Sequence, residues 1–138
     1  GPPPPVDLAA ERRNGDLVRS AIRHGRVSAS HDISHGGLIV ALAEMAMAGN
    51  IGAVIDLPLS PDLHAKLFGE DQARYVLAVP QAHVQRLLDD AAANDVPAEV
   101  IGTSGGPALR IGTALSVSVE TLHHAHEAWL PEYMSEEL

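Results

Sequence analysis

Apolar and polar positions along the chain repeat with two different spacings, which predict helices alternating with strands. Between Gly36 and Gly49, the residues Leu38, Leu42 and Met45 recur at the interval that places them on one side of a helix. Short runs rich in valine and isoleucine, bounded by glycine or proline, are typical of strands. Helices are therefore predicted over residues 8–25, 36–49, 60–70, 81–95 and 119–134, and strands over 26–33, 51–57, 73–80, 98–104, 108–112 and 115–119.

Capping and helix-breaking residues predict where these helices begin and end. Asp7 can cap the first helix and Gly25 can end it, while Gly15 inside it could cause a kink or a break. The third helix is expected to begin at Ser60. Proline lacks a backbone N–H, so Pro131 is expected to break the last helix.

The interleaving of strands with helices predicts an α/β (α+β) fold. We expect three layers, with a mixed sheet of about five to six strands flanked by helices. The strand at 26–33 should be buried and the strand at 73–80 should be central. With 138 residues the chain is long enough for one domain, which we place at residues 7–134. The proline-rich residues 1–6 are expected to be a linker or a tag remnant, and residues 135–138 a tail.

Composition and charge exclude several classes of function. A net charge of −9 and a 3% aromatic content argue against nucleic-acid binding, which uses basic surfaces and base stacking. No apolar run reaches the roughly 20 residues that a membrane span requires. The chain shows no secretory leader and contains no cysteine, so we expect a reducing compartment, the cytoplasm.

The segment "HDISHGG" at residues 31–37 is the first candidate site. A strand, a glycine-containing turn and a helix N-terminus together can bind an anion, because free backbone N–H groups and the helix dipole point at the turn. Ser34 could cap the helix, and Gly36 and Gly37 would let a phosphate approach the backbone. The alternative is a tight strand-to-helix turn without any ligand. The segment matches neither the Walker nor the dinucleotide-binding glycine pattern.

A second polar cluster precedes the strand at 73–80. It lies just before the start of that strand, where polar groups often face a ligand, and consists of Glu70, Asp71, Gln72 and Arg74. The alternative is a solvated loop in which the arginine pairs with a carboxylate.

Two groups of histidines could suggest a metal, but neither predicts a metal site. His31 and His35 flank Asp32 without a further nearby ligand, and residues 123–127 lack the order of ligands found in zinc hydrolases. Capping, hydrogen bonding or solvent exposure is the simpler interpretation of both groups.

Three segments in series resemble one known family. They are "SASHDISHGGLIVALAEMAMAGNIGAVIDL", "LFGEDQARYVLAV" and "VPAEVIGTSGG". Together they are similar to the C-terminal domain of the synthetase subunit of phosphoribosylformylglycinamidine synthase, in the aminoimidazole ribonucleotide synthetase superfamily. The resemblance covers roughly residues 7–134. The sequence departs from the family pattern at His35, where the family usually has a carboxylate, and at Asp71, which replaces a serine.

The resemblance implies a role in de novo purine biosynthesis. The parent enzyme would convert formylglycinamide ribonucleotide and glutamine-derived ammonia to the amidine, using ATP and Mg²⁺. The partners implied are the N-terminal ATP-binding domains of the same chain, a glutaminase subunit and a small accessory subunit. The family's catalytic and metal positions lie upstream, so no catalytic residue or metal ligand is assigned here. The fragment alone should be inactive and should require no cofactor.

Within this chain, the resemblance assigns Ser34, Gly36 and Gly37 to phosphate or nucleotide binding. It assigns Glu70 and Gln72 to the edge of a substrate or nucleotide. The alternative is a purely structural or assembly domain that closes a degenerate nucleotide half-site. The two alternatives differ in whether the glycine turn and Glu70 converge on one place.

Overall fold

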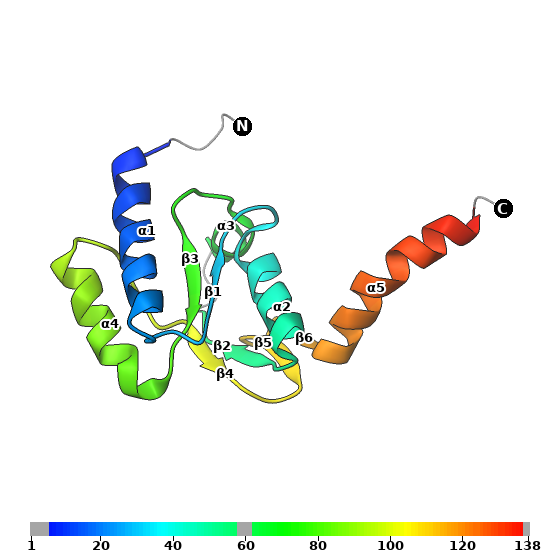
Figure 1. Cartoon of the computed structure of the whole chain (residues 1–138). Helices are drawn as coiled ribbons and strands as arrows, with labels where there is room; N and C mark the ends of the chain where they lie inside the picture. Colours follow the sequence, from blue (N-terminus) through cyan, green and yellow to red (C-terminus); the bar gives the residue numbers. More distant parts are fainter. Residues whose placement is uncertain (1–5, 58–61, 137–138) are drawn as a thin grey trace. The chain divides into compact units, whose positions relative to one another are not determined.

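A computed structural model describes residues 6–57 and 62–136. The described residues form five helices and six strands, in the order predicted from the sequence (Figure 1). The elements are α1 (Leu8–Arg23), β1 (Ala29–Asp32), α2 (Gly37–Gly49), β2 (Ala53–Ile55), α3 (Leu63–Phe68), β3 (Tyr75–Ala78), α4 (Gln81–Ala93), β4 (Gly102–Ser104), β5 (Ala108–Ile111), β6 (Leu115–Ser118) and α5 (Val119–Glu136).

The α/β class is confirmed, and the strands divide between two sheets. One sheet has four strands in the order β4-β2-β5-β6, in which β2 and β5 are parallel and the other pairs antiparallel. The other sheet is the antiparallel pair β1-β3, with His31 opposite Val76. The expectation of one sheet with β3 at its centre is therefore wrong, because β3 pairs only with β1 among the described residues.

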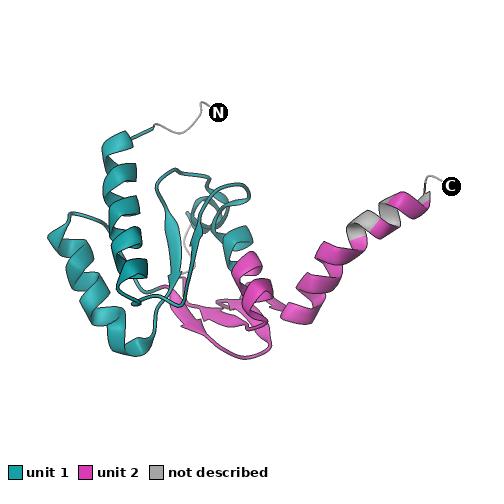
Figure 2. Ribbon diagram, in the orientation of Figure 1, with its two compact units in different colours: residues 1–42, 60–100 teal, residues 43–59, 101–138 magenta. Residues whose placement is uncertain are grey.

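The chain comprises two compact units (Figure 2). Unit 1 contains residues 1–42 and 60–100, and unit 2 contains residues 43–59 and 101–138. Helix α2 begins in unit 1 and ends in unit 2, while the β1-β3 pair lies in unit 1 and the four-stranded sheet in unit 2.

In unit 1, helix α1 packs against helix α4, and Arg26 forms an ion pair with Asp90. The buried face of α1 carries Val18 and Ala21, and the buried face of α4 carries Leu87 and Ala91. Asp7 caps α1 as predicted, accepting hydrogen bonds from two backbone N–H groups at 3.0 Å. Helix α1 continues through Gly15 without a break.

Unit 2 depends on a close approach between two backbone segments. The N–H of Gly52 donates to the Gly106 carbonyl at 2.7 Å, and the Gly105 N–H donates to the Gly52 carbonyl at 2.7 Å. A Cβ at Gly52 would lie 2.1 Å from the Ala108 carbonyl oxygen, so only glycine fits there. Beside this junction, Leu109 fills the centre of the sheet and is 1% exposed.

Three local predictions need correction or fall outside the described residues. Strand β1 is mostly exposed, with only His31 partly covered, so the prediction of a buried strand is wrong; pairing with β3 does not cover the faces of β1. Helix α5 continues past Pro131, since a proline removes only one backbone donor and the remaining turns can still form. The predicted helix start at Ser60 lies outside the described residues.

No helix in the described part of the chain combines the length and apolarity needed to span a membrane.

Candidate functional site

The glycine turn and the Glu70 segment, predicted separately from the sequence, are in contact within unit 1. The Gly36 N–H donates to Glu70 Oε1 at 2.8 Å. The Ile33 N–H donates to the Arg74 carbonyl at 2.8 Å, which joins the same two segments a second time. The Gly37 N–H donates to the Ser34 carbonyl at 3.1 Å and closes the turn. Two polar motifs that are 34 positions apart therefore form one local structure.

The two adjacent glycines are required by backbone conformation and by close packing. Gly36 has φ of +79° and Gly37 has φ of +72°, in the left-handed region that favours glycine. A Cβ at Gly37 would lie 2.7 Å from the Leu67 carbonyl oxygen and 2.8 Å from Phe68 Cα. A Cβ at Gly36 would lie 2.3 Å from Val40 Cγ2. Atoms of the protein itself therefore occupy the space that each missing side chain would need.

The carboxylate of Glu70 lies at the N-terminal end of helix α2, which is the end of a helix that favours an anion. Helix α2 begins at Gly37, and its N-terminal end carries a partial positive charge together with N–H groups that lack partners within the helix. Glu70 supplies a negative oxygen to the donor just before that end. A phosphate at the Gly36 N–H would meet this carboxylate, so the two anions would compete for one donor.

The loop that carries Glu70 is anchored at its other end by Arg74 and Asn14. Arg74 lies 3.8 Å from Asp71 Oδ2 and makes a long contact of 3.4 Å to the Gly69 carbonyl, near the end of α3. Asn14 Nδ2, on α1, donates to the Ala73 carbonyl at 2.8 Å. Sequence reasoning missed Asn14, because it lies 59 positions from its partner and belongs to no motif.

The remaining predicted site residues have no such contact in the described structure. Ser34 is exposed and offers its carbonyl, rather than its hydroxyl, to the turn. Gln72 is exposed in the loop, and no hydrogen bond of its side chain is found among the described residues. The structure thus brings Gly36 and Glu70 together, while nucleotide binding by any of the five predicted residues stays a prediction.

The histidines make local contacts. His31 Nδ1 lies 2.6 Å from the Asp32 carbonyl, and His123 Nδ1 lies 3.5 Å from Glu127 Oε1 one helical turn away. In the described ranges no three histidine, aspartate or glutamate side chains come close enough to hold one metal ion.

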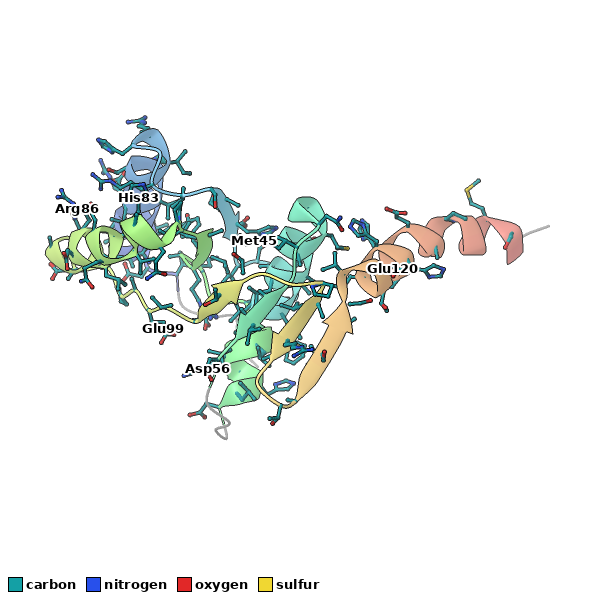
Figure 3. The ribbon with its side chains drawn as sticks, turned by 90° about the horizontal axis from the view of Figure 1, so that it is seen from below. Met45, Asp56, His83, Arg86, Glu99 and Glu120 are labelled. Carbon is teal, nitrogen blue, oxygen red and sulfur yellow. The ribbon has the colours of Figure 1, made fainter. Side chains whose placement is uncertain are left out.

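A cleft of about 490 Å³ lies between α1 and α4, also in unit 1. Asp90 is one of the residues that line it and pairs with Arg26 and Arg86, the latter at 3.0 Å. The Arg86 side chain projects from α4 (Figure 3) and is 66% exposed. Because one carboxylate is shared by two guanidinium groups that hold it in place, the cluster has an evident role in joining α4 to the segment after α1.

Comparison with known proteins identifies relatives of the whole chain. The chain is 51% identical over 133 residues to phosphoribosylformylglycinamidine synthase subunit PurL of Parvibaculum lavamentivorans, covering 96% of this chain. It is 54% identical over 135 residues to the protein of the same name from a Bradyrhizobium species. The chain spans 18% of the length of these curated relatives.

Solved structures share the fold. The chain of the Thermotoga maritima structure described as PurLQS superposes with a TM-score of 0.72 at 26% identity, over 85% of this chain and 22% of that chain. T. maritima PurL complexed with FGAR superposes with a TM-score of 0.74 at 24% identity, over 85% of this chain and 21% of that chain.

The family match agrees with these relatives and with the resemblance stated from the sequence. Residues 1–111 match the family described as AIR synthase related protein, C-terminal domain. This range includes both sheets up to β5, the glycine turn and the Glu70 loop. The chain belongs to this family of C-terminal domains.

Proposed function

We propose that this chain is the C-terminal domain of the synthetase subunit of phosphoribosylformylglycinamidine synthase. The observation that carries the proposal is an identity of 51–54% to PurL subunits over almost the whole chain. The parent enzyme converts formylglycinamide ribonucleotide, ATP and ammonia to the amidine, ADP and phosphate. ATP makes the amide oxygen a better leaving group, so the protein acts by positioning the reactants and neutralising charge.

The proposal includes the surroundings in which this domain works. The remaining domains of the parent chain would bind ATP and Mg²⁺, and a glutaminase subunit would supply ammonia with a small accessory subunit in the complex. The existence of T. maritima structures described as PurLQS and as PurL complexed with ATP supports this proposal. We place the parent enzyme in the cytoplasm. The domain alone would be inactive, because the family's ATP, magnesium and catalytic positions lie in the other domains of the parent chain.

Within the domain, we propose that the Glu70 loop lies at the edge of a nucleotide or substrate site. Glu70 and Gln72 would contact the polar edge of the ligand, and Ser34, Gly36 and Gly37 would face a phosphate. The hydrogen bond between Gly36 and Glu70 supports this, since it places the two predicted groups side by side. Phosphate binding at the turn would require the Glu70 carboxylate to rotate away from the Gly36 N–H.

A structural role is the second candidate, and one observation favours it. The turn is complete without a ligand, because Glu70 satisfies the Gly36 N–H and backbone atoms fill the space beside Gly37. In that case the domain closes a degenerate nucleotide half-site, and Glu70 acts as a permanent internal anion at the start of α2.

The deciding experiment measures ATP-dependent, ammonia-supported amidation by the full-length synthetase. The test variant is Glu70→Ala/Gln72→Ala, and the control is Glu99→Ala, which removes an exposed carboxylate elsewhere in unit 1. If the loop belongs to the working site, kcat/KM falls by about a hundredfold or more in the test variant, or roughly 2.7 kcal/mol, while folding is retained. Unchanged turnover in a folded variant would establish the structural role.

A third variant, Glu70→Gln, distinguishes charge from shape. The amide keeps an acceptor oxygen for the Gly36 N–H but removes the negative charge. If a phosphate competes with Glu70 for this donor, the variant binds ATP more tightly, because the repulsion between the anions is gone. An unchanged ATP affinity would show that no phosphate of ATP competes with Glu70 for the Gly36 N–H.

A further inference from the structure

Asn14 connects the first helix to the loop that carries Glu70. Its side chain lies in the middle of α1, and Nδ2 donates to the Ala73 carbonyl at 2.8 Å. Both groups are partly buried in unit 1, and 59 positions separate them in the sequence. The contact is therefore a tertiary tether rather than a local turn or a helix cap.

The backbone that Asn14 holds is in an unfavourable conformation. Ala73 has φ of +63°, in the left-handed region that alanine rarely adopts because its Cβ crowds the backbone. A residue of this kind keeps such a conformation only where the surrounding structure imposes it. The described hydrogen bond to the Ala73 carbonyl comes from Asn14, so this side chain is one of the groups that impose it.

The oxygen of the Asn14 amide is not hydrogen-bonded within the part of the chain that the structure describes. This atom, Oδ1, is buried. A buried acceptor without a partner lowers stability, and an apolar side chain of similar size would avoid that loss. The unpaired oxygen of Asn14 therefore lowers the stability of the fold, while the amide nitrogen holds the loop.

We propose that Asn14 is a positioning residue, which fixes the turn at Ala73 and thereby presents Glu70 and Gln72. The inference rests on the proposed function, in which this loop borders the site. Three hydrogen bonds connect α1 to the glycine turn through the loop. They join Asn14 to the Ala73 carbonyl, the Ile33 N–H to the Arg74 carbonyl, and the Gly36 N–H to Glu70. Release of the first contact frees the loop at the end opposite to Glu70.

The first readout is hydrogen exchange in the full-length synthetase, followed in peptides that cover residues 33–37 and 69–75. Asn14→Leu is close in size, removes the donor and also removes the unpaired oxygen. We expect exchange in both peptides to speed up by about tenfold or more, without a fall in the unfolding temperature. The matched control is Asn94→Leu, which removes an amide-to-carbonyl hydrogen bond of 2.7 Å at the end of α4, away from the loop.

A second variant, Asn14→Asp, tests the donor itself. Its ionised carboxylate cannot donate to the Ala73 carbonyl, whereas the protonated acid can. The folded structure therefore favours the protonated form and raises the pKa of the new carboxyl. Loop protection, corrected for the intrinsic pH dependence of exchange, should be lost at neutral pH and recovered as the pH falls through that pKa.

Several results would overturn the inference. Exchange in the two peptides that matches wild type in Asn14→Leu would show that the tether does not hold the loop. Faster exchange throughout unit 1 with a lower unfolding temperature would show a general structural role. A similar effect in Asn94→Leu would remove the specificity of the contact.

Kinetics separate this inference from the proposed function. If both hold, Asn14→Leu lowers kcat/KM for amidation, and Asn14→Leu adds no further loss to Glu70→Ala/Gln72→Ala. Faster loop exchange with unchanged amidation would retain Asn14 as the positioning residue and refute the role of the loop in the working site. Slower amidation without faster loop exchange would overturn the positioning role.

Discussion

Replacement of Gly37 by alanine tests whether the glycine turn is required by the packing of the protein itself. A Cβ at this position would lie 2.7 Å from the Leu67 carbonyl oxygen and 2.8 Å from Phe68 Cα. Ordinary contacts of a Cβ begin at 3.4 Å, so the end of α3 would have to move away from the turn. Both contacts are with backbone, which cannot yield as a side chain can.

The expected loss of stability has two parts. The left-handed conformation, with φ of +72°, costs alanine about 1–2 kcal/mol relative to glycine. The overlap with α3 adds about 1–3 kcal/mol, the usual range for forcing one extra group into a packed site. We therefore expect Gly37→Ala to lower the free energy of unfolding by about 2–5 kcal/mol in total.

Gly25→Ala is the matched control, because it shares the first part and lacks the second. Gly25 has φ of +63°, and nothing lies within 4 Å of the position that its Cβ would take. The entropy lost from the unfolded chain is the same in both variants and cancels in the comparison. Urea unfolding followed by circular dichroism should show Gly37→Ala to be less stable than Gly25→Ala by about 1–3 kcal/mol. Equal losses in the two variants would refute the close approach at Gly37.

Three further predictions, made with four substitutions, concern other parts of the two units. Asp7→Ala removes the cap of α1 and should lower the free energy of unfolding by about 0.5–2 kcal/mol in urea, whereas an unchanged midpoint would contradict a stabilising cap. Gly52→Ala should disrupt unit 2, because its Cβ would lie 2.1 Å from a carbonyl oxygen of β5; native dispersion of the unit 2 amides in a nuclear magnetic resonance spectrum would contradict this. Arg26→Met should destabilise the protein more than Arg86→Met, because the Arg26 side chain is 20% exposed and that of Arg86 is 66% exposed, while both pair with Asp90. The loss in Arg26→Met should also depend less on salt, and equal losses with equal salt dependence would contradict the difference in burial.

The candidate site was predictable in its parts and not in its connections. The glycines at 36 and 37 and the acidic Glu70 segment stood out by residue type at the ends of predicted elements. Their hydrogen bond, and the tether from Asn14 to Ala73, join positions far apart in sequence, where no periodicity carries a signal. From the sequence, the glycine pair predicts room for a phosphate beside the backbone. The structure shows in addition that a Cβ at either glycine would meet backbone or side-chain atoms of the protein, which no local pattern indicates.

The amino-acid sequence alone was enough to predict the order of helices and strands, the cap at Asp7 and the family to which the chain belongs. These follow from apolar spacing and capping residues, which act over a few neighbouring positions, and from motifs that can be recognised as strings. The pairing of the strands, the exposure of β1 and the contact between Glu70 and Gly36 could be seen only in the folded protein. The physical reason is that pairing and burial depend on which distant surfaces meet, and many pairings of six short strands fit the same local pattern equally well.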